Sequence, residues 1–201
     1  IGAGTKALSS SSYYGSVAIG RDSGAYNNAA VALGFDNHAY GPGSVAMGLN
    51  SFAHEDTSFA MGYNAEATSW RTIALGGGSR ASIAQAVAIG HSAVSDAYQS
   101  IALGSATLTE AQGQVAIGRY NAATGNSTAA DAHMFIVGNG SYLGRSNAMT
   151  VSYGGNLRVY DGVEARGPVR VSEHGDLSMG EFTGGTEDPA TLDTSLVYPT
   201  P

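Results

Sequence analysis

The sequence predicts an all-β fold, a β-solenoid in which each sequence repeat forms one coil. Two observations lead to this prediction. The pentapeptide SVAIG at residues 16–20 returns as AVALG, SVAMG, SFAMG, TIALG, AVAIG, SIALG and QVAIG, and the closing glycine stands at 20, 34, 48, 62, 76, 90, 104 and 118, always fourteen apart. The chain also contains 29 glycines and only 12% charged residues, which favours tightly turned β-structure over a helical domain.

Each repeat predicts one short strand around its alanine. Large apolar residues stand three and one positions before the glycine, as Val17 and Ile19 do in the first repeat, and Ala18 lies between them. Residues two apart share one face of a strand. We therefore expect the large columns to fill the core of each coil and the alanine column to point away from it.

Small residues after the glycine predict a second strand in each coil. They stand three and five positions after it, as Ser23 and Ala25 do in the first repeat. This alternation predicts a strand that faces the first one across a narrow interior, and equivalent coils would stack at about 4.8 Å. Helical repeats do not fit, because so short a repeat cannot hold a pair of helices and each would contain a glycine.

The alanine columns would give each chain a small, flat and nearly uncharged face. A solenoid that remained alone would cover such a face with polar side chains, so the pattern predicts oligomerisation. The expected seam between chains runs along Ala18, Ala32, Ala46, Ala60, Ala74, Ala88, Ala102 and Ala116.

The repeats also resemble a known family. SVAIGRDSGA at residues 16–25 and SVAMGLNSFA at 44–53 are similar to the head repeat of trimeric autotransporter adhesins, the YadA-like group of bacterial surface proteins, which reads roughly N-S-V-A-I-G-x-x-S-x-A. The resemblance spans about residues 16–123. It implies a left-handed parallel β-roll, a homotrimer of chains joined side by side, and an adhesive role on a cell surface. Related heads occur in bacteriophage tail fibres and other trimeric fibres, so the motif identifies the scaffold more firmly than the class of protein that contains it.

Breaks in the period divide the chain into three parts. Residues 1–138 are expected to form the head, with surplus residues as projecting loops, because Gly2 and Gly20, and likewise Gly118 and Gly138, are farther apart than one coil. Residues 139–182 lose the period but keep alternating apolar positions, which indicates a β-rich neck or stalk. Residues 183–201 hold three prolines and are expected to be extended or disordered.

Charge and composition exclude several kinds of partner. The net charge is −7 and no basic run occurs, which argues against nucleic acid and against binding an anionic membrane surface. No stretch is long and apolar enough to span a membrane as a helix, and no cysteine is available for disulfides. Because the chain opens on IG, like the end of another repeat, we expect a fragment whose export signal and outer-membrane anchor lie elsewhere.

No motif in the sequence predicts an enzyme. GAGTKA at residues 2–7 fits a loose dinucleotide-binding pattern but lacks the surrounding strand–helix–strand unit, and Gly76 to Gly78 indicate a tight turn. The histidines lack metal-ligand spacing, and the cluster His54, Glu55 and Asp56 is better explained as a solvated turn than as a cation site. We therefore expect no catalytic residue, metal or cofactor. A solenoid carbohydrate-active enzyme stays open as an alternative, since carboxylates from different coils can meet.

Aromatic residues at the turns are the best candidates for ligand binding. Tyr26, Tyr40 and His54 stand six positions after successive glycines, and Trp70 and Tyr98 stand eight positions after theirs. Such side chains often anchor protein or glycan ligands, although they also pack over coil edges or against a neighbouring chain.

Together these features predict a non-enzymatic adhesin or fibre segment. It would lie at the extracellular cell surface and attach to a surface protein or glycan of a host or prey cell, or to extracellular matrix. The alternative is a bacteriophage tail-fibre or tailspike segment on a virion tail that recognises a bacterial envelope glycan.

Overall fold

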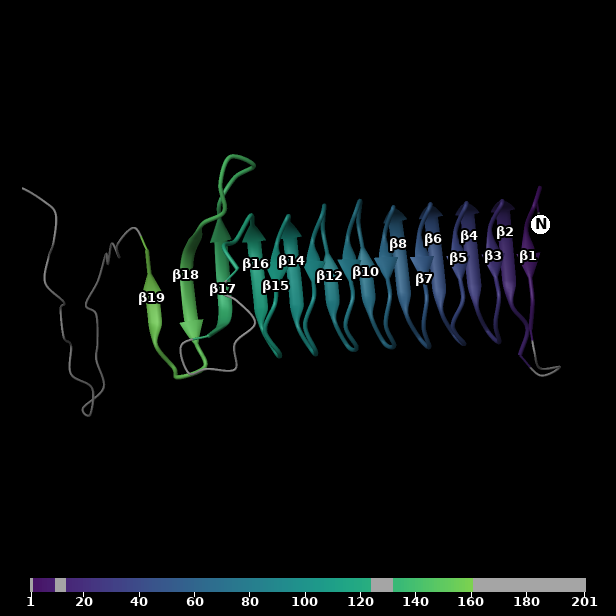
Figure 1. Cartoon of the computed structure of the whole chain (residues 1–201). Helices are drawn as coiled ribbons and strands as arrows, with labels where there is room; N and C mark the ends of the chain where they lie inside the picture. The colour runs from purple at the N-terminus through teal and green to yellow at the C-terminus, as the bar shows by residue number, and fades with distance from the viewer. Residues whose placement is uncertain (1, 10–13, 124–131, 161–201) are drawn as a thin grey trace, which may run out of the picture. The chain divides into compact units, whose positions relative to one another are not determined.

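The computed structural model describes residues 2–9, 14–123 and 132–160. These residues form nineteen β-strands and no helix, and they wind into a row of stacked coils (Figure 1). Each regular coil contributes one strand to each of two sheets, so the all-β parallel β-solenoid that the repeat predicts is confirmed.

The first sheet contains the repeated pentapeptides. Its strands pair in parallel, and each residue stands beside its equivalent in the next repeat, as Val17 does beside Val31 and Ala74 beside Ala88. In the regular coils the strands are β2 (Val17–Arg21), β4 (Val31–Phe35), β6 (Val45–Leu49), β8 (Phe59–Tyr63), β10 (Ile73–Leu75), β12 (Val87–Ile89), β14 (Ile101–Ser105) and β16 (Val115–Arg119).

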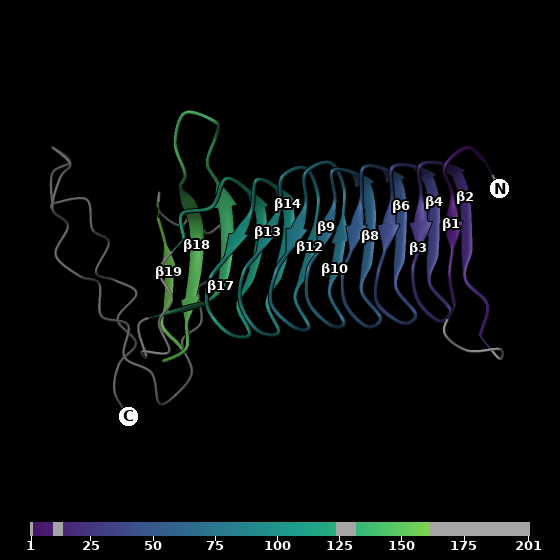
Figure 2. The same ribbon diagram turned by 45° about the vertical axis from the view of Figure 1, so that its right-hand side comes forward.

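The second sheet is made of two-residue strands, also parallel and stacked in sequence order (Figure 2). They begin four residues after Gly2 and after each coil glycine from Gly20 to Gly104, which confirms the predicted second strand. They are β1 (Lys6–Ala7), β3 (Gly24–Ala25), β5 (His38–Ala39), β7 (Phe52–Ala53), β9 (Glu66–Ala67), β11 (Arg80–Ala81), β13 (Val94–Ser95) and β15 (Leu108–Thr109).

The alanine columns lie inside the coils, so the predicted orientation of the first sheet is wrong. Seven of the eight alanines between the large residues are completely buried within the single chain, and Ala18 is 5% exposed. Across the interior stand other small residues, including Ala25 and Ala39, both also fully buried. The predicted seam is therefore wrong at every position, because the chain itself covers Ala18, Ala32, Ala46, Ala60, Ala74, Ala88, Ala102 and Ala116.

The width of the coil explains the reversal. A coil this short, which must include two turns, leaves its two sheets close together, and in the regular coils the positions that face each other between the sheets hold small side chains of alanine, serine or threonine. Since strand side chains alternate, placing alanine inside turns the large apolar columns outward. Val17 and Ile19 are 45% and 46% exposed, and most of their counterparts in later coils are half-buried on the outer surface.

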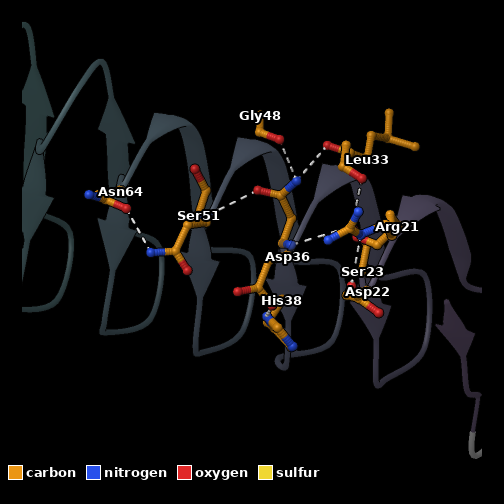
Figure 3. Close-up of polar contacts among 12 residues, drawn as sticks. Arg21, Asp22, Ser23, Leu33, Asp36, His38, Gly48, Ser51 and Asn64 are labelled. Carbon is orange, nitrogen blue, oxygen red and sulfur yellow. Dashed lines mark hydrogen bonds and ion pairs between the residues drawn. The ribbon is translucent and has the colours of Figure 1, made fainter. Parts of the chain in front are cut away.

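Buried polar side chains three residues after the glycine complete the interior. Asn37 Nδ2 donates hydrogen bonds to the carbonyl oxygens of Leu33 (2.9 Å) and Gly48 (2.7 Å), and Asn37 Oδ1 accepts one from the Ser51 amide at 3.0 Å (Figure 3). In the neighbouring coils, Ser23 and Ser51 donate to the equivalent glycine carbonyls. This column therefore satisfies carbonyl groups that the turn would otherwise leave buried without a partner.

The repeated glycine is required by the approach of successive coils. Gly76 has φ 122°, and a Cβ atom there would lie 2.3 Å from the carbonyl oxygen of Gly90 in the next coil. No side chain fits in that space, and the backbone conformation itself favours glycine. The glycine column thus fixes both the bend after each first-sheet strand and the contact between coils.

Strand pairing changes from parallel to antiparallel after the last regular coil. Strand β17 (His133–Asn139) pairs in parallel with β16 and sets Gly138 beside Gly118, so the chain rejoins the first sheet in register after the longer interval. Strands β18 (Asn147–Ser152) and β19 (Leu157–Val159) then add in antiparallel fashion. Residues 10–13 and 124–131 of the expected loops, the remaining neck and the tail lie outside the described residues. The division into head and neck stays a prediction.

A candidate binding surface on the second sheet

Five aromatic rings stack on the outer side of the second sheet, and we call them the aromatic ladder. They are Tyr26, His38, Tyr40, Phe52 and His54, carried by β3, β5 and β7 or by the residue that follows each strand. Because coils stack in register, side chains at the same position of consecutive coils lie directly above one another. A ladder along the solenoid axis is the result.

The rings form two columns that also contact each other. Tyr26 and Tyr40 stack with centroids 5.0 Å apart, and Tyr40 and His54 follow at 5.5 Å. In the parallel column His38 and Phe52 lie 5.2 Å apart. His38 bridges the columns, with its ring 5.7 Å from that of Tyr40. These separations are typical of favourable aromatic pairs, so the ladder stiffens the surface of three consecutive coils.

Polar groups border the ladder. His38 Nδ1 lies 3.7 Å from Asp36 Oδ1, and His54 Nε2 lies 3.9 Å from Glu66 Oε1. Burial, followed by the charges of Tyr26 and Asp36, raises the pKa of the Tyr40 phenol, which therefore stays a neutral hydroxyl at physiological pH. The surface thus combines ring atoms with imidazole, phenol and carboxylate groups.

An open hollow of about 190 Å³ adjoins the end of the ladder. It is lined by Asn50, Phe52, Asn64 and Glu66, which come from two successive coils. Asn50 and Asn64 follow β6 and β8, and Asn50 Nδ2 donates a 2.6 Å hydrogen bond to Asn64 Oδ1 across the coils (Figure 3). Phe52 and Glu66 face outward from β7 and β9, where they pair in register.

The structure brings together three of the five residues that the sequence singled out. Tyr26, Tyr40 and His54 form one column of the ladder. Trp70 and Tyr98 lie in the turns that follow β9 and β13, and no ring contact links either of them to the ladder among the described residues. Trp70 instead stacks under the Arg71 guanidinium, 4.9 Å from the ring centroid. Ligand binding by all five residues stays a prediction.

Sequence reasoning missed His38 and Phe52, the second column of the ladder. Both stand four residues after a coil glycine, directly before a buried alanine. The alternation of a strand therefore places them on the outer face. The signal was available, but the same column holds glycine, glutamate and arginine in nearby coils and does not look aromatic as a whole.

The described residues contain no candidate metal site. No group of three or more His, Asp or Glu side chains within them is placed to hold a metal ion. Glu55 and Asp56 lie in an exposed turn after His54, as the sequence suggested. Within the same residues no helix is long and apolar enough to cross a membrane.

Comparison with known proteins identifies the repeat. The family model of the YadA head domain repeat (2 copies) matches six overlapping segments, residues 14–37, 25–51, 39–65, 53–79, 67–93 and 84–107. No curated protein and no solved structure shows significant similarity to the chain. The matched segments follow the coils of the solenoid. Residues 14–107 therefore belong to the family of YadA head domain repeats, and the coils that these residues form are YadA-like head coils.

Proposed function

We propose that this chain is a segment of a homotrimeric fibre that attaches to a target surface from outside the cell. Heads built from this repeat are typical of structural adhesins rather than of enzymes. The observation that carries the proposal is the apolar outer face of the first sheet, which a single chain leaves partly in water.

The outer face of the first sheet repeats in every coil. We call it the aliphatic stripe, and it consists of the residues one and three positions before each coil glycine. Val17, Ile19, Met61, Ile73 and Ile89 are each at least 36% exposed, and no charged residue interrupts the two columns. Continuous exposed apolar surface of this kind marks an interaction site in soluble proteins.

Sister chains are the partners that fit this stripe best. Each copy carries the same columns at the same spacing, so parallel copies in register bring apolar residues together at every coil. Three copies are proposed because the YadA-like heads that this region resembles are trimers. Closed symmetry would cover all the stripes and leave three equivalent second-sheet faces toward the solvent.

Repetition of one face also supports an attachment role. Three equivalent faces on one fibre, and many fibres on one surface, convert weak individual contacts into firm adhesion. The aromatic ladder on the second sheet supplies a candidate contact on each face. The proposed location is the extracellular surface of the cell, as the head family implies.

Two measurements test the proposal. Sedimentation equilibrium should give three times the chain mass of 20.3 kDa. Beads coated with the protein should bind cells, or components of an array of glycans and matrix proteins, more firmly than beads coated with a monomeric variant. A monomeric wild-type protein would contradict the assembly, and equal retention of the two kinds of bead would contradict the role of multivalency.

A further inference from the structure

The hollow beside the aromatic ladder contains polar atoms that the protein does not use. The bond from Asn50 to Asn64 engages one Asn50 N–H group and the Asn64 carbonyl oxygen. Among the described residues, no hydrogen bond involves the side-chain oxygen of Asn50 (Oδ1) or the side-chain nitrogen of Asn64 (Nδ2). The hollow therefore presents an amide acceptor and an amide donor at fixed positions.

The two other lining residues add complementary chemistry. Glu66 contributes a carboxylate whose side chain is 44% exposed. Phe52 contributes apolar ring atoms and is held in place by stacking on His38 at 5.2 Å. One aromatic surface beside two amides and a carboxylate is suited to a ligand that has apolar C–H faces and several hydroxyl groups. Sugar rings have this combination.

We propose that this hollow is a subsite for one ring of a neutral or amino-sugar glycan. The volume of about 190 Å³ is below the roughly 300 to 1,000 Å³ of sites for drug-sized molecules, which suits a single ring rather than a larger ligand. The ring's C–H face would contact Phe52. Its hydroxyl groups would pair with Asn50, Asn64 and Glu66.

Charge selects among glycans. Glu66 is the charged group in the lining, and the whole chain has a net charge of −7. An acidic sugar would place its carboxylate beside another carboxylate and would be repelled. A sugar amine would instead be attracted to Glu66, so the site should prefer an amino sugar to a neutral one, and a neutral one to an acidic one.

Backbone pairing argues against an extended peptide as the ligand. Peptides that add to a sheet need unpaired backbone groups at its edge. Here the N–H groups of all four lining residues already donate to other coils: Asn50 to Phe35 O, Phe52 to Ala65 O, Asn64 to Leu49 O and Glu66 to Ser79 O, at 2.9–3.0 Å. The hollow therefore offers side chains and not a strand edge.

The proposed subsite deepens the proposed function and rests on it, since it names the ligand class that the fibre would attach to. Saturation-transfer difference NMR on the whole chain tests the proposed subsite directly. The probes are three oligosaccharides of three sugar units each, made of glucosamine, N-acetylglucosamine or galacturonate. We expect binding in that order of strength, with little or none for galacturonate. Equal binding of all three, strongest binding of galacturonate, or no binding would overturn the inference.

A matched pair of variants locates the binding. Asn64→Ala and Gln99→Ala each place alanine at a left-handed position, φ 53° and 56°. Each also removes a hydrogen bond between the side-chain amides of neighbouring coils, of 2.6 and 2.9 Å. Only Asn64 lines the hollow. Asn64→Ala should weaken N-acetylglucosamine trimer binding about five- to tenfold, while Gln99→Ala should change it less than about twofold.

Further outcomes separate this inference from the proposed function. Glu66→Gln should remove the preference for the glucosamine trimer and leave binding of the N-acetylglucosamine trimer. Equal effects of Asn64→Ala and Gln99→Ala would place the binding elsewhere, and loss of matrix-protein binding in Asn64→Ala alone would assign the hollow to protein. Either of these two results, with the protein still trimeric, would overturn the subsite alone, whereas a wild-type species of 20.3 kDa would overturn the proposed protein trimer.

Discussion

Two neighbouring residues on β10 give opposite predictions. Ala74 points into the interior, is fully buried, and pairs in register with Ala60 and Ala88 in the adjacent coils. Ile73 points outward on the aliphatic stripe and is 36% exposed. Arginine at position 74 should therefore prevent folding of the chain, whereas arginine at position 73 should prevent only the assembly of chains.

The magnitudes follow from burial. An unpaired guanidinium among alanines costs several kcal/mol and also needs space that a close-packed interior lacks, which is a large part of a total stability of about 5–15 kcal/mol. At position 73 the isolated chain loses about 1 kcal/mol or less, because the arginine head remains in water. Assembly would lose about 0.5–1 kcal/mol of burial per chain, from the 36% of Ile73 still exposed, and would have to desolvate three cations.

Light scattering coupled to size exclusion, together with far-UV circular dichroism, distinguishes the two outcomes. Ile73→Arg should give a folded β-rich species of 20.3 kDa, and Ala74→Arg should give a protein with a weakened β signal that aggregates or unfolds. Ala74→Ser is the matched control for position 74 and should remain folded and assembled, because serine occupies other interior positions such as Ser51. A folded Ala74→Arg monomer, or an Ile73→Arg trimer as stable as the wild type, would refute the assignment of the two faces.

Three other predictions concern stability. Gly76→Ala should lower the free energy of unfolding by about 3 kcal/mol or more and lower the melting temperature sharply. Gly77→Ala should be tolerated, because a Cβ atom at residue 77 meets only His91 Cδ2 at 3.7 Å. Equal melting temperatures of the two variants would contradict the close contact between coils. Asn37→Ala should lower the free energy of unfolding by about 2–4 kcal/mol in denaturant titrations, because it removes the three hydrogen bonds of a fully buried side chain. Asn37→Ser should recover part of the loss, and a change below about 0.5 kcal/mol would argue against this role. Burial, and then the charge of Arg158, lowers the pKa of His133 in the folded protein. As pH falls, the unfolded chain therefore binds a proton before the folded one does, and stability should fall below the ordinary histidine pKa of about 6.5. His133→Phe should flatten this part of the curve of melting temperature against pH, and an unchanged curve would contradict the assignment.

The fold could be predicted largely because the repeat constrains it so strongly. The glycine spacing predicted the length of a coil, and the two alternating patterns predicted the positions of both strands in the regular coils. The repeat period does not determine which face of a strand points into the interior of the coil. That choice depends on the space between the sheets, which is so narrow that alanines from both sheets, such as Ala32 and Ala39, already fill it and are completely buried.

The candidate site was less accessible from sequence. One column of the ladder was visible because Tyr26, Tyr40 and His54 recur with the period. The contact of that column with His38 and Phe52 depends on the lateral distance between positions within a short strand. The hollow depends further on side-chain volumes in two coils, and residue spacing alone does not give these.

The in-register stacking of equivalent coils makes the head modular. Every regular coil offers its neighbours the same backbone surface above and below, so a whole repeat unit can be removed or duplicated without disturbing the pairing of the others. Each such change alters the length of the solenoid by about 4.8 Å. Gain or loss of repeats in evolution can therefore adjust the length of the solenoid in small fixed steps, independently of the coils that carry the aromatic rings.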